Sequence, residues 1–184
     1  MRGKTGVARE VMAMNKLAYM VVDCSGEEAD YPARELNAHS PTTKGWQSPR
    51  FCAYPQTLLL QMHDSQCQIG QLQILAHQSK IPSKIEVVIG RNGTTFESCS
   101  EVERLGYISL DSNERSSFKA RELKSVHLNA DDVAFVKLIV HRCHVNKLNA
   151  YNQVGLIAIN CLGRSKSVVG RWVISAGERA KRRL

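Results

Sequence analysis

Hydrophobic residues fall in short runs along this chain, and polar or turn-forming residues separate the runs. The two most apolar runs are residues 134–140 (AFVKLIV) and 154–159 (VGLIAI). Both are short and rich in β-branched residues, so we expect two buried strands. Further runs predict strands over residues 17–24, 56–62, 68–77, 84–89, 107–110, 121–128 and 167–175. Residues 121–128 (RELKSVHL) alternate less cleanly than the others and are also compatible with a helix, but a sandwich needs a partner strand here. About eight short strands with turn signals between them predict an all-β fold, a sandwich or jelly roll.

The segment between the two most apolar strands, residues 144–153 (HVNKLNAYNQ), is too long for a tight hairpin turn. A connection of this length can carry the chain from one sheet to the other. Its three asparagines can support tight local geometry, because asparagine tolerates positive φ and bonds its own backbone. We therefore expect an ordered polar loop.

One stretch favours a helix. In residues 96–105 (FESCSEVERL), Thr94, Thr95 or Ser98 can cap the first turn, and Gly106 stands where a helix ends in the left-handed conformation. The sequence therefore predicts one short helix beside the strands.

The net charge of +8 is concentrated at the two ends of the chain. Residues 1–16 carry +3 and residues 164–184 carry +6, which leaves residues 17–163 at −1. We accordingly expect a flexible basic leader (1–16), a sandwich domain (17–175) and a basic tail (176–184) that leads into a linker or coiled coil of a longer protein. The basic ends can meet an acidic partner, or can simply keep the domain soluble.

Several classes of protein are disfavoured. No apolar run is long enough to span a bilayer, and no secretory signal is evident. Six cysteines without a CxxC pair indicate reduced thiols in the cytosol. The near-neutral domain lacks the basic groove with interleaved aromatic residues that nucleic-acid binding needs. Nor is there a nucleophile elbow or a glycine-rich phosphate loop. We expect no enzyme, no cofactor, no nucleic-acid partner and no membrane span.

Two groups of residues have metal-ligand chemistry. His141 and Cys143 share one face of an extended chain and are zinc-ligand types, but the sequence nominates no further ligand. The loop after the first strand offers the oxygen ligands that Ca²⁺ prefers, although without EF-hand spacing. Its four weak calcium candidates are Asp23, Glu27, Glu28 and Asp30. A solvated acidic loop is the plainer interpretation.

The loop over residues 36–49 closes on two large aromatic residues, Trp46 and Phe51. We expect both to pack over an end of the sandwich. A solvent-facing Trp46 would instead be able to stack on a sugar.

Several stretches, taken in order, resemble one family, that of the N-terminal jelly-roll domain of the centrosomal protein of 104 kDa. The stretches are residues 46–52 (WQSPRFC), 76–78 (AHQ), 81–86 (IPSKIE), 104–110 (RLGYISL), 119–126 (KARELKSV) and 145–154 (VNKLNAYNQV). The resemblance runs from about residue 17 to residue 163. It implies a galactose-binding-like (discoidin-type) jelly roll from a protein of centrioles, ciliary tips and growing microtubule ends.

The resemblance favours a non-catalytic protein-interaction module that serves cilium assembly in the cytoplasm and cytoskeleton. Its expected partners are centriolar and ciliary proteins, with microtubules as a further partner of the basic ends. The alternative is a discoidin-like module that binds Ca²⁺ or carbohydrate through its end loops. Candidate contact surfaces are residues 27–34, 41–50 and 144–153 and the tail. The candidate partner-binding residues are Trp46, Arg50, His144, Asn146, Lys147, Asn149, Tyr151, Asn152, Arg179, Lys181, Arg182 and Arg183.

Overall fold

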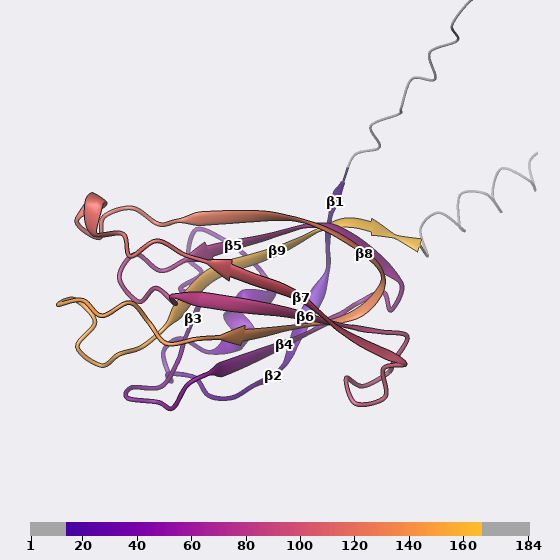
Figure 1. Cartoon of the computed structure of the whole chain (residues 1–184), viewed down its shortest axis with the longest axis horizontal. Coiled ribbons are helices and arrows are strands. Elements are labelled where there is room, and N and C mark those ends of the chain that lie inside the picture. The colour runs from indigo at the N-terminus through magenta and orange to yellow at the C-terminus, as the bar shows by residue number, and fades with distance from the viewer. Residues whose placement is uncertain (1–13, 167–184) are drawn as a thin grey trace, which may run out of the picture.

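The computed structural model describes residues 14–166 of the chain, which form strands and two short 3-10 helices, η1 and η2 (Figure 1). The predicted strand over residues 167–175 and the tail candidates Arg179, Lys181, Arg182 and Arg183 lie outside the described residues. The strands are β1 (Asn15–Leu17), β2 (Tyr19–Cys24), β3 (Trp46–Gln47), β4 (Gln56–Met62), β5 (Cys67–Ala76), β6 (Lys84–Arg91), β7 (Glu101–Ser109), β8 (Leu123–Val140) and β9 (Gly155–Ser165). The helices are η1 (Ala33–Asn37) and η2 (Glu114–Ser116).

Strand β8 joins the two layers of the sandwich. Its first half pairs with β5, and its second half pairs with β4 and β6. Between the halves, Asp132 takes a positive φ of 55°, and Figure 1 shows the strand curving from one layer into the other. Strands that switch sheets through such bends make the corners of β-sandwiches. The separate strands predicted over 121–128 and 134–140 are therefore one continuous strand.

All the sheet pairs are antiparallel. One layer holds β9 between β5 and the short strands β1 and β3. The other layer runs in the order β2, β4, second half of β8, β6 and β7. The segment from residue 144 to residue 153 thus leads from one layer to the other, as its length predicts. This arrangement confirms the predicted all-β jelly-roll sandwich.

The core lies between the layers and follows the two-residue period of strands. In β4 the buried positions alternate with half-buried ones from Gln56 to Met62. Leu58 and Leu60 of this strand are fully buried, as are Leu72 and Ile74 of β5 in the opposite layer. Burial of such side chains stabilises the fold by about 1.5–3 kcal/mol each.

The predicted helix over residues 96–105 is wrong. Ser98 Oγ accepts hydrogen bonds from the amides of Thr94 and Thr95 and so closes only a local turn, after which β7 pairs with β6. Strand β7 lies at the edge of its layer, where charged residues stay in water and imitate the polar face of a helix. Gly106, the expected helix stop, instead takes a φ of 137° at a register shift within this strand.

The expected boundary of the leader is also corrected. Asn15 and Lys16 belong to β1, where they pair with Gly163 and Leu162 of β9. The free edge of β9 offers these residues the ladder hydrogen bonds that a flexible leader would lack.

The two ends of the sandwich differ. The described chain begins in β1 and leaves after β9 at one end, whereas the segment over residues 144–153 projects at the other (Figure 1). Within residues 14–166, no helix has the length and hydropathy to cross a membrane.

Candidate functional site

Two loops expose apolar side chains at the end of the sandwich away from β1. Phe51, in the β3–β4 connection, is 69% exposed, and Val145 and Tyr151, in the β8–β9 connection, are 84% and 44% exposed. The rings of Phe51 and Tyr151 meet edge to face, with centroids 5.6 Å apart. We call Phe51, Val145 and Tyr151 the rim patch. Exposed apolar side chains gathered in this way mark interaction sites.

A hollow of about 300 Å³ opens at the rim patch. That volume is at the lower end of the range for ligand pockets. The hollow is lined by Phe51, Cys52, Tyr54, Arg142, Cys143, Val145 and Asn152. Apolar and sulfur-bearing groups dominate these walls, Arg142 adds a positive charge, and no carboxylate contributes.

Direct hydrogen bonds join the two rim loops. The Phe51 amide donates to the Tyr151 carbonyl at 2.9 Å, and Tyr54 Oη donates to the Asn152 carbonyl at 2.5 Å. Phe51 and Asn152 both adopt positive φ, at 52° and 51°. This conformation is uncommon for a bulky residue and persists only where surrounding contacts enforce it. The rim patch is therefore held in a defined conformation by contacts between the two loops.

Asparagine side chains fix the loop over residues 144–153. Asn146 Oδ1 accepts the Leu148 amide at 3.0 Å. The Asn149 side chain bonds the backbone of Gln153 twice. Its Nδ2 donates to the Gln153 carbonyl at 2.7 Å, and its Oδ1 accepts the Gln153 backbone amide at 3.0 Å. The prediction that asparagines order this loop is thus confirmed.

A buried polar network lies beneath the loops. Gln153 is 1% exposed, and its Nε2 donates to the Ser48 carbonyl at 2.8 Å and to Glu28 Oε2 at 3.1 Å. Lys80 Nζ donates to Gln153 Oε1 at 2.8 Å and also to Gln47 Oε1. Gln47 and Gln153, which are far apart in the sequence, thereby meet at the Lys80 ammonium group.

The turn that presents Lys80 depends on a neutral histidine. His77 Nδ1 accepts the amides of Ser79 at 3.1 Å and Lys80 at 3.2 Å. Burial, together with the charges of Lys80 and Arg121, lowers the pKa of His77 to about 4. Burial likewise lowers the pKa of Lys80, against the opposing effect of the Glu28 carboxylate.

The structure separates the predicted contact residues into accessible and internal ones. Arg50 and Tyr151 are exposed and lie together, with the guanidinium 4.6 Å from the ring centroid. Arg50 Nε also lies 3.4 Å from Glu28 Oε2. In contrast, Trp46 is fully buried and donates from Nε1 to the Gly26 carbonyl at 3.0 Å, so it cannot stack on a sugar. Asn149 is 3% exposed and has the structural role described above.

The remaining candidates of the loop flank the rim patch. His144 is half-buried, and its Nε2 lies 2.9 Å from the Leu110 carbonyl. Asn146 Nδ2 donates to the Ser79 carbonyl at 2.8 Å. Lys147 and Asn152 are exposed.

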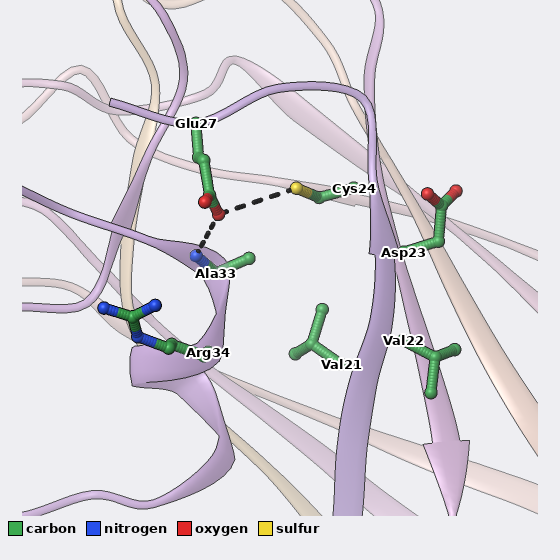
Figure 2. Close-up of a pocket in the computed structure, with 7 residues that line it drawn as sticks. All are labelled: Val21, Val22, Asp23, Cys24, Glu27, Ala33 and Arg34. Atoms are coloured by element: carbon green, nitrogen blue, oxygen red, sulfur yellow. Dashed lines mark hydrogen bonds between the residues drawn. The ribbon is translucent and has the colours of Figure 1, made fainter. Parts of the chain in front are cut away.

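The acidic loop does not assemble into a calcium site. Figure 2 shows Glu27 pointing toward Cys24 and Ala33, whereas Asp23 points away on the other side of β2. Glu27 Oε2 accepts the Ala33 amide at 2.7 Å and Cys24 Sγ at 3.7 Å. Glu28 is held by Arg50 and Gln153. Over the range that the structure describes, no three His, Cys, Asp or Glu side chains converge as metal ligands.

His141 and Cys143, the two zinc-ligand types predicted to share one strand face, contact different groups. His141 Nε2 lies 2.7 Å from Glu86 Oε1, and Cys143 is buried in the wall of the hollow. The cysteines of the chain are all free, as predicted.

Two parts of the site are not evident from the sequence. The expected packing of Phe51 on the sandwich is wrong, because the ring is 69% exposed and lies edge to face with Tyr151. The role of Lys80 has no local sequence signal, because its partners Gln47 and Gln153 come from distant segments.

Solved structures share the fold at low sequence identity. The family 32 carbohydrate-binding module of C. perfringens NanJ, solved with galactose, superposes with a TM-score of 0.62 at 13% identity, covering 81% of this chain and 98% of that one. The N-terminal domain of the single-strand break repair protein XRCC1 gives 0.63 at 16% identity, covering 81% and 99%. These similarities support the galactose-binding-like jelly roll.

Sequence relatives are closer. The centrosomal protein of 104 kDa from Homo sapiens is 50% identical over 152 residues, and that from Mus musculus is 47% identical over 152 residues. Each alignment covers 81% of this chain and 16% of the relative. A family model described as "Centrosomal protein CEP104, N-terminal domain" matches residues 45–163. The chain therefore belongs to the family of the N-terminal domain of the centrosomal protein CEP104.

Proposed function

We propose that the chain is a non-catalytic protein-interaction module that binds a centriolar or ciliary protein through the rim patch. The observation that carries this proposal is that exposed Phe51 and Val145 line a largely apolar hollow, with Tyr151 packed edge to face on Phe51. A hollow of this kind accepts an apolar anchor side chain, and such anchors supply most of the affinity of an interface. The network around Lys80 holds the surface in shape, so little conformational entropy is lost on binding.

The cellular setting of the proposal comes from the relatives, which are named as centrosomal proteins. The module would place a longer protein at the centriole or ciliary tip and so serve cilium assembly. The basic ends would add attraction to an acidic microtubule surface. Because that attraction is screened by salt, co-sedimentation with microtubules should weaken with rising salt and with removal of residues 176–184.

Proximity labelling with the chain fused to a biotin ligase tests the rim patch. We expect Phe51→Ser with Val145→Asp to lose most labelling of centriolar and ciliary proteins relative to the original chain. The matched control is Tyr107→Ser with Val102→Asp on the edge strand β7, where the two side chains are 64% and 52% exposed. Labelling that survives the rim variant unchanged would refute the proposal.

A carbohydrate-binding module is the second candidate, because Phe51 presents an exposed aromatic ring at the loop end and the NanJ neighbour was solved with galactose. Calorimetry against a glycan panel separates the two candidates. A glycan that binds the original chain, but not Phe51→Ser, would favour this function over protein binding.

A further inference from the structure

The rim loops have an unusual charge composition. Residues 48–55 and 141–153 contain no Asp or Glu, whereas they contain Arg50, Arg142 and Lys147. Residues 17–163 as a whole carry a net charge of −1, so the part of this range outside the two rim loops carries −4. The rim is therefore a local cationic surface on a nearly neutral domain.

Two of the three cations have no carboxylate partner. Arg50 is within 3.4 Å of Glu28, but neither Arg142 nor Lys147 forms a salt bridge anywhere in residues 14–166. Both are exposed, and Arg142 lines the hollow beside Phe51 and Val145. Positive charge with no internal partner thus adjoins an apolar recess.

From this juxtaposition we propose that the rim patch binds an acidic linear segment of a partner protein. An apolar side chain of the segment enters the hollow, and flanking Asp or Glu residues pair with Arg142 and Lys147. The guanidinium of Arg142 suits a bidentate carboxylate, which is stronger and more directional than a contact to a point charge. This inference rests on the proposed function and adds the chemistry of the partner.

A protein segment fits this surface better than other polyanions do. Nucleic-acid binding uses a groove of many cations that tracks the phosphate backbone. Here a single cation, Arg142, lines the recess, and Lys147 follows two residues after the lining residue Val145. Anionic membranes attract clusters of basic residues, with four to eight being typical of lipid-binding segments. Aliphatic Val145, at 84% exposure, completes an apolar pocket that suits a side-chain anchor.

Selection from a random 16-residue peptide display library, with the chain as bait, tests the inference. We expect the enriched peptides to carry at least one large apolar residue flanked by Asp or Glu, with acidic residues about twofold over the input library. Arg142→Glu with Lys147→Glu should weaken binding of a synthesised winner at least tenfold. The matched control, Arg115→Glu with Lys119→Glu, reverses two exposed charges in another loop and should leave binding within twofold.

The outcomes distinguish this inference from the proposed function. If Phe51→Ser with Val145→Asp abolishes labelling in cells but the charge reversal does not, the rim patch stands and an acidic partner is refuted. If neither variant changes labelling, the proposed function fails as well. Enrichment of basic or neutral peptides, or no enrichment, overturns the inference. The inference is also overturned if no peptide is enriched while the original chain binds phosphatidylserine vesicles or polyuridylate and the charge-reversed variant does not.

Discussion

The Gln153 side chain offers the sharpest test of the network beneath the rim. The change Gln153→Ala removes three hydrogen bonds, those to the Ser48 carbonyl, to Glu28 and from Lys80. The first is a buried neutral bond, with a net contribution of about 0.5–1.5 kcal/mol, and the other two involve charged groups, at about 1.5–3 kcal/mol each. These contributions do not simply add, because the three bonds form one network.

The loss should fall below the sum of the three values. Lys80 retains Gln47, Glu28 retains Arg50, and water can reach both charged groups. We therefore expect Gln153→Ala to lower the free energy of unfolding by about 3 kcal/mol. Gln153→Glu should be equally damaging, since it keeps an acceptor for Lys80 but places a second carboxylate beside Glu28.

Urea unfolding at 25 °C, followed by tryptophan fluorescence, measures the effect. Gln66→Ala is the matched control, because Gln66 is exposed in the β4–β5 turn and should change stability by less than about 0.5 kcal/mol. A loss below about 1 kcal/mol for Gln153→Ala would show that the network does not stabilise the loops.

Three further changes probe the support of the rim. Because the pKa of His77 is lowered to about 4, the unfolded chain binds the proton first. Stability should fall by about 2 kcal/mol as the pH drops from 6.5 to 4, and His77→Gln should remove that part of the urea-midpoint shift. Gly45→Ala should cost more than about 3 kcal/mol in the same assay, because φ is 78° and the new Cβ would lie 2.2 Å from the Leu156 carbonyl oxygen; an unchanged midpoint would contradict this. Trp46→Phe should cost about 2 kcal/mol through the lost Nε1 bond to Gly26 and the vacated volume, and a thermal scan with an unshifted midpoint would argue against it.

The hydrophobic pattern predicted most of the fold because alternation reports burial directly. β4 is a clear case, since Leu58, Leu60 and Met62 face the core at two-residue intervals along the strand. The pattern wrongly predicted a helix at β7. This strand lies at a sheet edge, where exposed charged residues are compatible with a helix as well as with a strand. The pattern also divided β8, because a bend at Asp132 interrupts alternation without ending the strand.

The site was less predictable than the fold. The loop over residues 144–153 was identified because its asparagines have local partners, and local chemistry is visible in sequence. Phe51 adopts a positive φ and donates its amide to Tyr151 in a distant loop, and the composition reveals neither this conformation nor the exposure of the ring. Lys80 meets Gln47 and Gln153 only after the sandwich has formed, so its role depends on tertiary structure.

Site-specific photo-crosslinking tests most directly whether the rim patch contacts a partner protein. A photoreactive amino acid at Val145 should capture, in ciliated cells, the same centriolar or ciliary proteins whose labelling Phe51→Ser with Val145→Asp abolishes. The same probe at Lys119, which is exposed in another loop, should capture none of them. Capture from position 119 but not from position 145 would place the interaction surface elsewhere on the sandwich and contradict the account.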